Sequence, residues 1–142
     1  MLERRLRAWH RTQEASLRLE EVPGVGVLTA TAVVATVGGN AKLFEQGRQF
    51  GAWLGLTPKE HSSGDKRRIL GISKRGDSYL RRLLVHGARS IVRAHRPTGD
   101  PWLTALLARR PKNVAVVAVA QRNARVLWAM LAHGTVYRPR AV

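Results

Sequence analysis

The clearest pattern of apolar and polar positions in the chain lies between Asp77 and Arg96. Apolar residues recur there at helical spacing and mark one side of the segment: Leu80, Leu84, Ala88 and Ile91. Basic residues recur at spacings of four, three and four and mark the opposite side: Arg82, His86, Arg89 and Arg93. This pattern predicts an amphipathic helix with one face in a core and a basic face toward solvent.

The remaining periodic segments also favour helices over strands. Further helices are expected at 2–20, from the residue after Gly26 to Val37, at 46–54, at 102–109 and from Pro111 to His133, with a short segment from residue 40 or 41 to Phe44. Asp77 suits an N-cap, Pro111 a first helical turn and Gly134 a helix end. Segments 57–74 and 97–101 are predicted to be loops.

The last helix is expected to bury one face against the core. The predicted apolar face consists of Val117, Ala120, Ala124, Leu127, Trp128 and Leu131. Together these elements predict an all-α, mainly helical fold that contains helix-hairpin-helix-like DNA-binding elements.

The chain divides into three predicted parts. Residues 1–20 form a charged helical arm, in which Leu2, Leu6 and Trp9 make a narrow apolar stripe typical of the end of a coiled-coil linker. Residues 21–135 form a compact helical domain, and 136–142 a loose basic tail. A length of 142 residues with 44% hydrophobic positions suits one domain with an arm.

Charge narrows the class of partner. The chain has 25 basic and 9 acidic residues, a net charge of +16, and arginine outnumbers lysine by 20 to 5. Such a charge repels itself in the folded state, which favours a polyanionic partner. Nucleic acid is the first candidate, because the guanidinium fork matches phosphate oxygens and base edges, and an anionic membrane surface is the second. A GC-rich genome would also enrich arginine.

Several other classes are disfavoured. The chain has no cysteine, and its five histidines lack the paired spacing of a metal motif. The first residues carry too many charges for a signal peptide. The longest aliphatic run, Val114 to Ala120, is far shorter than the roughly 20 residues that span a bilayer. We therefore expect a soluble, cytoplasmic protein that makes no membrane contact.

The run Val-Pro-Gly-Val-Gly at 22–26 is the first candidate site. Gly24 and Gly26 would let backbone N–H groups approach a DNA phosphate, helped by the positive end of the following helix. Such contacts position DNA without reading its sequence. The alternative is a plain loop before a helix.

The stretch 61–68 is the second candidate site. Ser63 precedes Gly64, and Lys66, Arg67 and Arg68 follow. A serine oxygen that attacks a phosphodiester needs such cations to stabilise the developing charge, and it needs a proton acceptor. Ser-Ser-Gly is also common in ordinary polar loops, so spacing alone leaves that interpretation open.

The basic turn at 71–76 and the start of the next helix are the third. Lys74 and Arg75, together with Arg81 and Arg82 beyond the Asp77 cap, would face a phosphate backbone. Arg89 extends the basic side of the same helix. A well-capped surface helix with a solvated face is the alternative.

The acidic residues argue against a metal-dependent nuclease site in this chain. Such a site needs several carboxylates around its ions. The nine here are scattered along the sequence, and no Asp-x-Asp or comparable cluster occurs. We therefore predict no metal ligands and no cofactor in this chain.

The ordered combination of motifs resembles the C-terminal domain of the one-ten insertion-sequence family of transposases, related to the pilin-gene invertases. The resemblance covers about residues 20–135. It rests on Val-Pro-Gly-Val-Gly at 22–26, Phe-Gly-Ala-Trp-Leu-Gly-Leu-Thr-Pro at 50–58, Ser-Gly at 63–64, Gly-Ile-Ser-Lys-Arg-Gly-Asp at 71–77, and Leu-Arg-Arg at 80–82. The tail motifs at 110–118 and 123–125, with Trp128, also fit.

This resemblance implies a serine domain that acts with a RuvC-like domain, joined to it by a coiled coil. Four carboxylates of the RuvC-like domain would bind a divalent metal such as magnesium. It also implies a guide RNA from the mobile element, and a composite site in which Ser63 of one protomer forms a transient phosphoserine link to DNA, with Ser62 as the alternative. The RuvC-like domain is missing from this sequence, so independent transposition is not expected.

Three hypotheses follow. The chain is a transposase serine domain that binds DNA and RNA; or a non-catalytic nucleic-acid-binding module; or an assembly remnant that dimerises with full-length transposase. A homo-oligomer and association with the bacterial nucleoid are further expectations.

Overall fold

The computed structural model describes residues 2–39, 41–56 and 77–139. Every regular element within those ranges is a helix, so the all-α prediction is confirmed. The elements are α1 (Leu2–Thr12), α2 (Glu14–Leu19), α3 (Val27–Val37), the short 3₁₀ helix η1 (Ala41–Leu43), α4 (Gly47–Trp53), α6 (Ser78–Ala94), α7 (Pro101–Arg109) and α8 (Lys112–His133).

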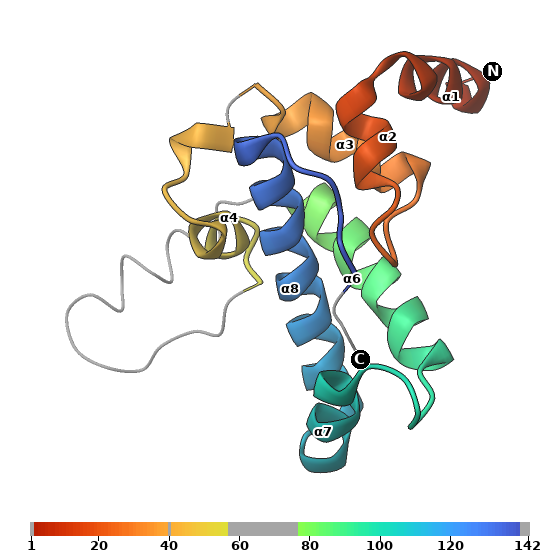
Figure 1. Cartoon of the computed structure of the whole chain (residues 1–142), viewed down its shortest axis with the longest axis vertical. Coiled ribbons are helices and arrows are strands. Elements are labelled where there is room, and N and C mark those ends of the chain that lie inside the picture. Colours follow the sequence, from red (N-terminus) through yellow and green to blue (C-terminus); the bar gives the residue numbers. More distant parts are fainter. Residues whose placement is uncertain (1, 40, 57–76, 140–142) are drawn as a thin grey trace.

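Helix α8 is the central element of the described fold. It packs against α6 on one side and α4 on the other, while α2 and α3 lie across one end and α7 lies at the opposite end (Figure 1). Val119, Ala120, Ala124 and Leu127 are completely buried along it. Phe50 from α4 and Leu84 from α6 complete the centre of the core.

The described part of the chain contains one helix, α8, that is long and apolar enough to span a membrane, with a mean hydropathy of 1.3. Half of its apolar window is buried inside the fold. A core helix of a soluble protein has the same character. Trp128 of α8 also holds the helix inside the fold, because its indole Nε1 donates a buried hydrogen bond of 2.7 Å to the carbonyl oxygen of Ala41.

The predicted single helix over 2–20 is wrong. Gln13 is extended, with φ −107° and ψ 105°, and it separates α1 from α2. The break changes the direction of the chain between α1 and α2 (Figure 1), and His10 of α1 contacts Ser16 and Glu20. These contacts between the two helices outweigh the helical propensity of a charged sequence.

Helix α6 matches its prediction closely. Asp77 is its N-cap and accepts hydrogen bonds from the backbone N–H groups of Tyr79 (2.9 Å) and Leu80 (3.1 Å). The apolar side is buried at Leu80, Leu84 and Ala88 and half-buried at Ile91, and the predicted basic side is exposed.

The apolar face of α8 differs in part from the prediction. Val117 was expected in the core, but it is 40% exposed, and Leu131 is half-buried. Ala115, Val116 and Val119 are buried instead. Pro111 lies one residue earlier than expected, at the N-cap, and Gly134 ends the helix in a left-handed conformation with φ 64°, as predicted.

Candidate nucleic-acid interface

The connection between α2 and α3, residues 20–26, is held to the core by its apolar residues and by α8. We call this connection the glycine turn. Val22 and Val25 are buried. The carbonyl oxygen of Pro23 accepts a hydrogen bond of 3.0 Å from Nδ2 of the buried Asn123 in α8. A buried amide with a fixed partner fixes the turn in one position.

The backbone of the glycine turn also lies very close to the backbone of α6. Gly24 has φ +85°, a conformation that favours glycine. A Cβ on Gly87 of α6 would lie only 2.0 Å from the carbonyl oxygen of Gly24, and a Cβ on Gly24 would lie 2.8 Å from Cδ1 of Ile91. Both glycines are therefore required for the turn to lie this close to α6.

A polar cluster of the buried His10 and Ser16 with the exposed Glu20 supports the start of the turn. Nδ1 of His10 lies 2.6 Å from Oγ of Ser16, and its Nε2 lies 3.0 Å from Oε1 of Glu20. Serine, histidine and carboxylate in series is also the arrangement of an activated nucleophile. Ser16 has no exposed surface, however, and no substrate can reach its hydroxyl. The cluster therefore joins α1, α2 and the glycine turn as a structural support.

Gly26 lies on the outside of this support. It is exposed, it is the N-cap of the 11-residue helix α3, and no side chain caps the helix there. A Cβ built on Gly26 would meet nothing within 4 Å. The first N–H groups of a helix have no intrahelical partner. The turn therefore presents backbone donors and the positive end of α3 at an open surface.

The basic side of α6 faces a different direction. Arg82, Arg89 and Arg93 are exposed, and Arg81 is half-buried. Each residue of an α-helix advances by about 100°, which places the exposed Arg82, Arg89 and Arg93 on the side of α6 opposite Gly87. None of the three forms an ion pair with another of the described residues. Two candidate phosphate contacts thus lie on opposite sides of one helix.

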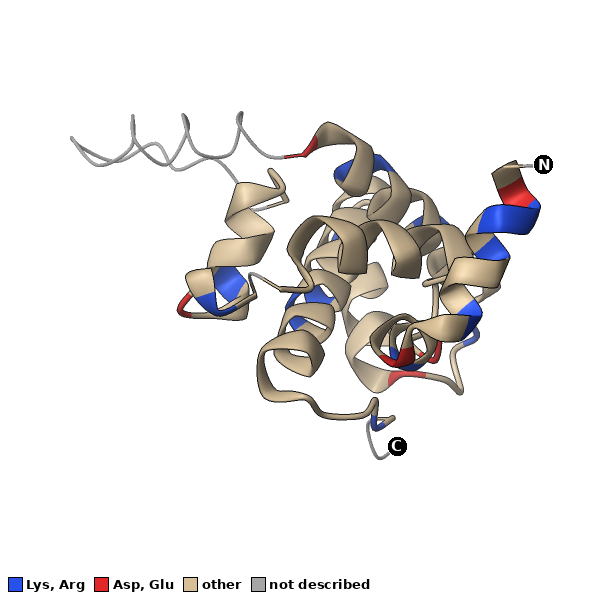
Figure 2. Cartoon of the chain, turned by 90° about the horizontal axis from the view of Figure 1, so that it is seen from above, with Lys and Arg blue, Asp and Glu red and all other residues tan. Residues whose placement is uncertain are grey.

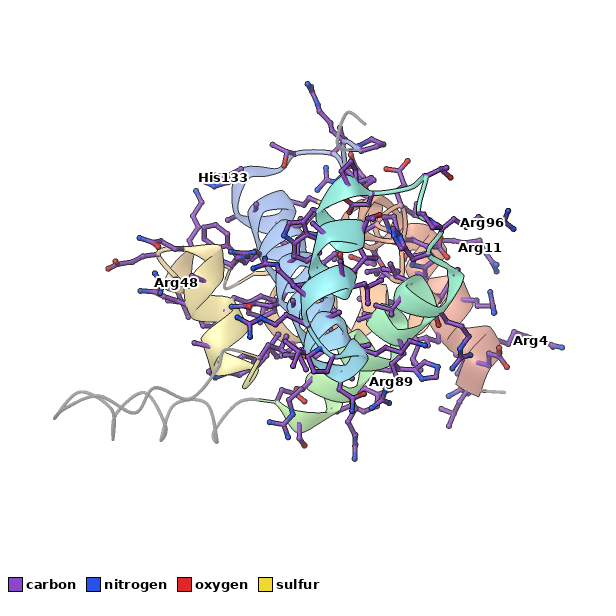
Figure 3. All side chains as sticks on the ribbon, turned by 90° about the horizontal axis from the view of Figure 1, so that it is seen from below. Arg4, Arg11, Arg48, Arg89, Arg96 and His133 are labelled. Carbon is purple, nitrogen blue, oxygen red and sulfur yellow. The ribbon has the colours of Figure 1, made fainter. Side chains whose placement is uncertain are left out.

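Basic residues also occur on other elements. Figure 2 shows Lys and Arg positions on α1 and α4 as well as on α6. Arg48 of α4 projects on one side of the molecule, and Arg4 and Arg11 of α1 project on the other (Figure 3). The positive charge is therefore spread over several faces, which suits a protein that a nucleic acid contacts at more than one place.

The other predicted site residues lie outside the described residues. They are Ser62, Ser63, Lys66, Arg67, Arg68, Lys74 and Arg75. Asp77 and α6 follow directly after this segment in the chain. Within residues 2–39, 41–56 and 77–139, no group of three or more His, Cys, Asp or Glu side chains is arranged to hold a metal ion.

Two residues that position this surface, Asn123 and Gly87, were not among the predicted site residues. Asn123 was recognised only as part of a family motif, because it is the fold that brings its side chain to Pro23, 100 residues away in sequence. Gly87 did leave a signal. Glycine in the middle of a strong helix costs about 1 kcal/mol relative to alanine, which often marks a close approach of another backbone.

The known proteins that this chain resembles include transposases. The profile of the "Transposase IS116/IS110/IS902 family" matches residues 16–103, which is more than half of the chain. A protein of Pseudomonas aeruginosa described as a probable family 20 transposase is 51% identical over 141 residues, covering 97% of this chain and 41% of that protein. The transposase for insertion sequence element IS1111A of Coxiella burnetii is 45% identical over 139 residues, covering 96% of this chain and 38% of that protein.

A third relative extends the pattern. The transposase for insertion sequence element IS1328 of Yersinia enterocolitica is 40% identical over 139 residues, covering 96% of this chain and 41% of that protein. The chain thus spans about two fifths of the length of these relatives. No solved structure matches the chain.

Proposed function

The chain belongs to the IS116/IS110/IS902 family of transposases, and from this we propose that it is a helical domain that holds DNA during strand exchange in insertion-sequence transposition. The observation that carries the proposal is the braced glycine turn. It presents the N-terminus of an 11-residue helix at an exposed glycine, with arginines on the far side of the neighbouring helix.

In this proposal the glycine turn and α3 form the second half of a helix-hairpin-helix-like unit. Gly26 lets the backbone N–H groups at the start of α3 reach a phosphate oxygen, and Gly24 lets the turn lie against α6. Because the contact is made by backbone, it positions DNA without reading bases. Hydrogen bonding by Asn123 and packing of Val22 and Val25 keep the donors in place before DNA arrives.

The arginines of α6 make a second contact. Arg82 and Arg89 lie across the helix from the glycine turn, and an α-helix with its side chains is about 10 Å wide. The two contacts therefore meet different phosphates, on two strands or on two turns of one duplex. Lys74 and Arg75 precede α6 in sequence and, with Arg81, extend this basic contact.

We further propose that Ser63 is the nucleophile, with Ser62 as the alternative. Its hydroxyl oxygen would form a bond to phosphorus while the bond to the leaving sugar oxygen breaks, and the serine proton would pass to a base. Lys66, Arg67 and Arg68 would stabilise the charge that develops on the phosphoryl oxygens. This role rests on the family resemblance and on the residues around the serine.

The remaining components would come from other parts of the assembly. A RuvC-like domain would supply the carboxylates and a divalent metal such as magnesium, and a guide RNA would supply target choice. A homo-oligomer or association with full-length transposase would bring the serine to the carboxylates of another protomer. The assembly would act on bacterial DNA in the cytoplasm, at the nucleoid.

A groove on α1 favours the alternative of a non-catalytic binding or dimerisation module. Leu6, Trp9, Leu28 and Tyr79 line this hollow of about 380 Å³ between α1, α3 and α6. Leu28 and Tyr79 are 47% and 44% exposed. Apolar surface of this kind is typical of a protein contact. In this case the chain would associate with full-length transposase and inhibit it.

The proposal is tested by separating binding from chemistry. Duplex DNA binding should weaken steeply as salt rises, because phosphate contacts release counterions. A DNA affinity that does not change with salt would overturn the nucleic-acid role.

A second experiment tests the chemistry of the serine. The carboxylate domain of a relative is supplied in trans, and a covalent protein–DNA adduct is sought. Wild type should form it and Ser63→Ala should not, with Ser62→Ala as the matched control. Adduct formation by Ser63→Ala would remove Ser63 from that role.

A further inference from the structure

A second hollow, open to solvent on one side, lies beside the glycine turn between α6, α7, α8 and the tail that follows α8. Its volume is about 680 Å³. Pro23 of the glycine turn and Asn123 line one part of it, and Trp102 and Arg122 line another. Tyr137 and Arg138 of the tail also line it. The tail returns along α8 (Figure 1), which is why residues that follow the helix line the cavity.

The wall formed by α7 and α8 is a rigid aromatic platform. The guanidinium carbon of Arg122 lies 4.1 Å from the centre of the Trp102 ring, so the cation covers one face of the indole. An Nη of Arg122 also donates to Oδ2 of Asp100 at 2.8 Å. The other oxygen of Asp100 accepts from the backbone N–H of Trp102 at 2.9 Å. Indole, guanidinium and carboxylate therefore fix one another.

The ionisation of Asp100 maintains this platform. Burial raises the pKa of its carboxyl. The hydrogen bond and positive charge of Arg122, together with hydrogen bonds from the backbone N–H groups of Trp102 and Leu103, lower this pKa by more than burial raises it. The pKa of Asp100 therefore lies below its usual value. The carboxylate is thus charged at neutral pH. The charge of Arg122 is balanced by this carboxylate. Its planar guanidinium is therefore better suited to stacking than to binding a phosphate.

The size and lining of the cavity suit an aromatic heterocycle. Cavities of about 300–1,000 Å³ with mostly apolar walls and few polar groups are typical of small-molecule sites. Bases that leave a helix stack on aromatic side chains and on arginine planes. Trp102 and Tyr137 are both half-buried, so each keeps an edge or face at the cavity, and the exposed Arg138 adds a cation for the adjoining phosphate.

We propose that this cavity binds one unstacked nucleobase of the nucleic acid that the glycine turn holds. The inference rests on the proposed function and deepens it, because the hydrogen bond between Asn123 and Pro23 joins the cavity to the glycine turn. Pro23 lines the cavity and lies three residues before Gly26 in the chain, so a strand whose phosphate lies at Gly26 would have the cavity within reach of an unpaired base. The domain would then prefer DNA with a bulged or single-stranded position over fully paired DNA.

The test compares two DNA probes of equal length and charge, one fully paired and one with a single unpaired thymine. Affinities are measured by fluorescence anisotropy for wild type, Tyr137→Ala, Trp102→Ala and Trp102→Phe. Tyr79→Ala, which removes an exposed aromatic outside the cavity, is the matched control. Base–aromatic stacking is worth about 1–3 kcal/mol, so the preference of wild type for the bulged probe should fall by about 5- to 150-fold in the two alanine variants.

The results for paired and bulged DNA separate the cavity assignment from the proposed function. Paired DNA should bind equally well to all variants, and Trp102→Phe should keep most of the preference, because a phenyl ring still stacks. Tyr137 lies in the tail outside the helices, so Tyr137→Ala tests the cavity even if Trp102→Ala fails to fold. Equal binding of both probes by wild type, with normal salt dependence, would overturn the cavity assignment alone. A preference unchanged in Tyr137→Ala and Trp102→Ala would do the same. Binding of neither probe by wild type would overturn the proposed function as well.

Discussion

Gly24 and Gly87 are in direct backbone contact, although they belong to different elements and are far apart in sequence. A Cβ on Gly87 would lie 2.0 Å from the carbonyl oxygen of Gly24. The glycine turn can therefore lie against α6 only because neither residue has a side chain. The contact joins the exposed N-terminus of α3 to the helix that bears the arginines.

The first prediction concerns Gly87→Ala. Alanine would favour the helix by about 1 kcal/mol, but its methyl group would push the backbone of the turn away. We expect a net loss of about 1–3 kcal/mol in the free energy of unfolding, measured by urea denaturation. Gly51→Ala is the control, because a Cβ there meets Gln121 at an ordinary 3.5 Å. Equal stability of Gly87→Ala and wild type would show that the turn does not need this contact.

The second prediction concerns the hydrogen bond between Asn123 and Pro23. Asn123→Ala leaves the carbonyl of Pro23 without its donor, which costs about 1–3 kcal/mol. Asn123→Asp should cost at least as much, since a carboxylate cannot donate and would face a carbonyl oxygen. Asn113→Ala, at an exposed position of the same helix, should be nearly neutral. Thermal unfolding of the three variants checks the order, and a neutral Asn123→Ala would contradict it.

The third prediction separates binding from folding at Gly26. Its backbone is extended, with φ −95°, and a Cβ would meet nothing within 4 Å. Gly26→Ala should therefore lower the free energy of unfolding by no more than about 1 kcal/mol, the cost of a poorer N-cap. DNA affinity should fall several-fold, and more for Gly26→Val, if the backbone approaches a phosphate closely. Unchanged affinity in both variants would remove Gly26 from the interface.

The fourth prediction concerns acid. The folded pKa of Asp100 lies below its usual value of 3.8, because Arg122 and backbone N–H groups outweigh the effect of burial. The stabilisation it gives is complete above the usual value and is lost as pH falls through the folded pKa. Asp100→Asn should therefore be about 1 kcal/mol less stable than wild type at neutral pH, since asparagine still caps α7 but loses the ion pair. Denaturation curves should converge as the pH falls below that range, and a constant difference would contradict this.

The sequence predicts the local features of this fold well and the contacts between elements poorly. The amphipathic period of α6, the cap at Asp77 and the stop at Gly134 are encoded by adjacent residues, so they can be predicted. The break at Gln13 cannot, because good helix formers lie on both sides. It is stabilised by His10 reaching Ser16 and Glu20, which is a contact between helices.

The candidate site follows the same rule. The glycine pattern at 24 and 26 and the arginine side of α6 are visible in sequence. Their placement on opposite sides of one helix is not, because it depends on Gly87 meeting Gly24. Trp102 and Arg122 belong to no recognisable motif, and Asn123 belongs to a tail motif that does not reveal its partner; their roles appear only when α7, α8 and the tail come together.

The salt dependence of duplex binding in an arginine variant tests the central claim most directly. The logarithm of affinity should fall with the logarithm of salt by about 0.9 for each phosphate contact. We predict that replacing Arg82, Arg89 and Arg93 together by glutamine reduces this slope by roughly 2–3. The charge-matched control replaces the exposed Arg109, Arg110 and Lys112, where α7 ends and α8 begins, by glutamine and should change the slope little. An unchanged slope in the α6 variant, or an equal reduction in both variants, would contradict the account.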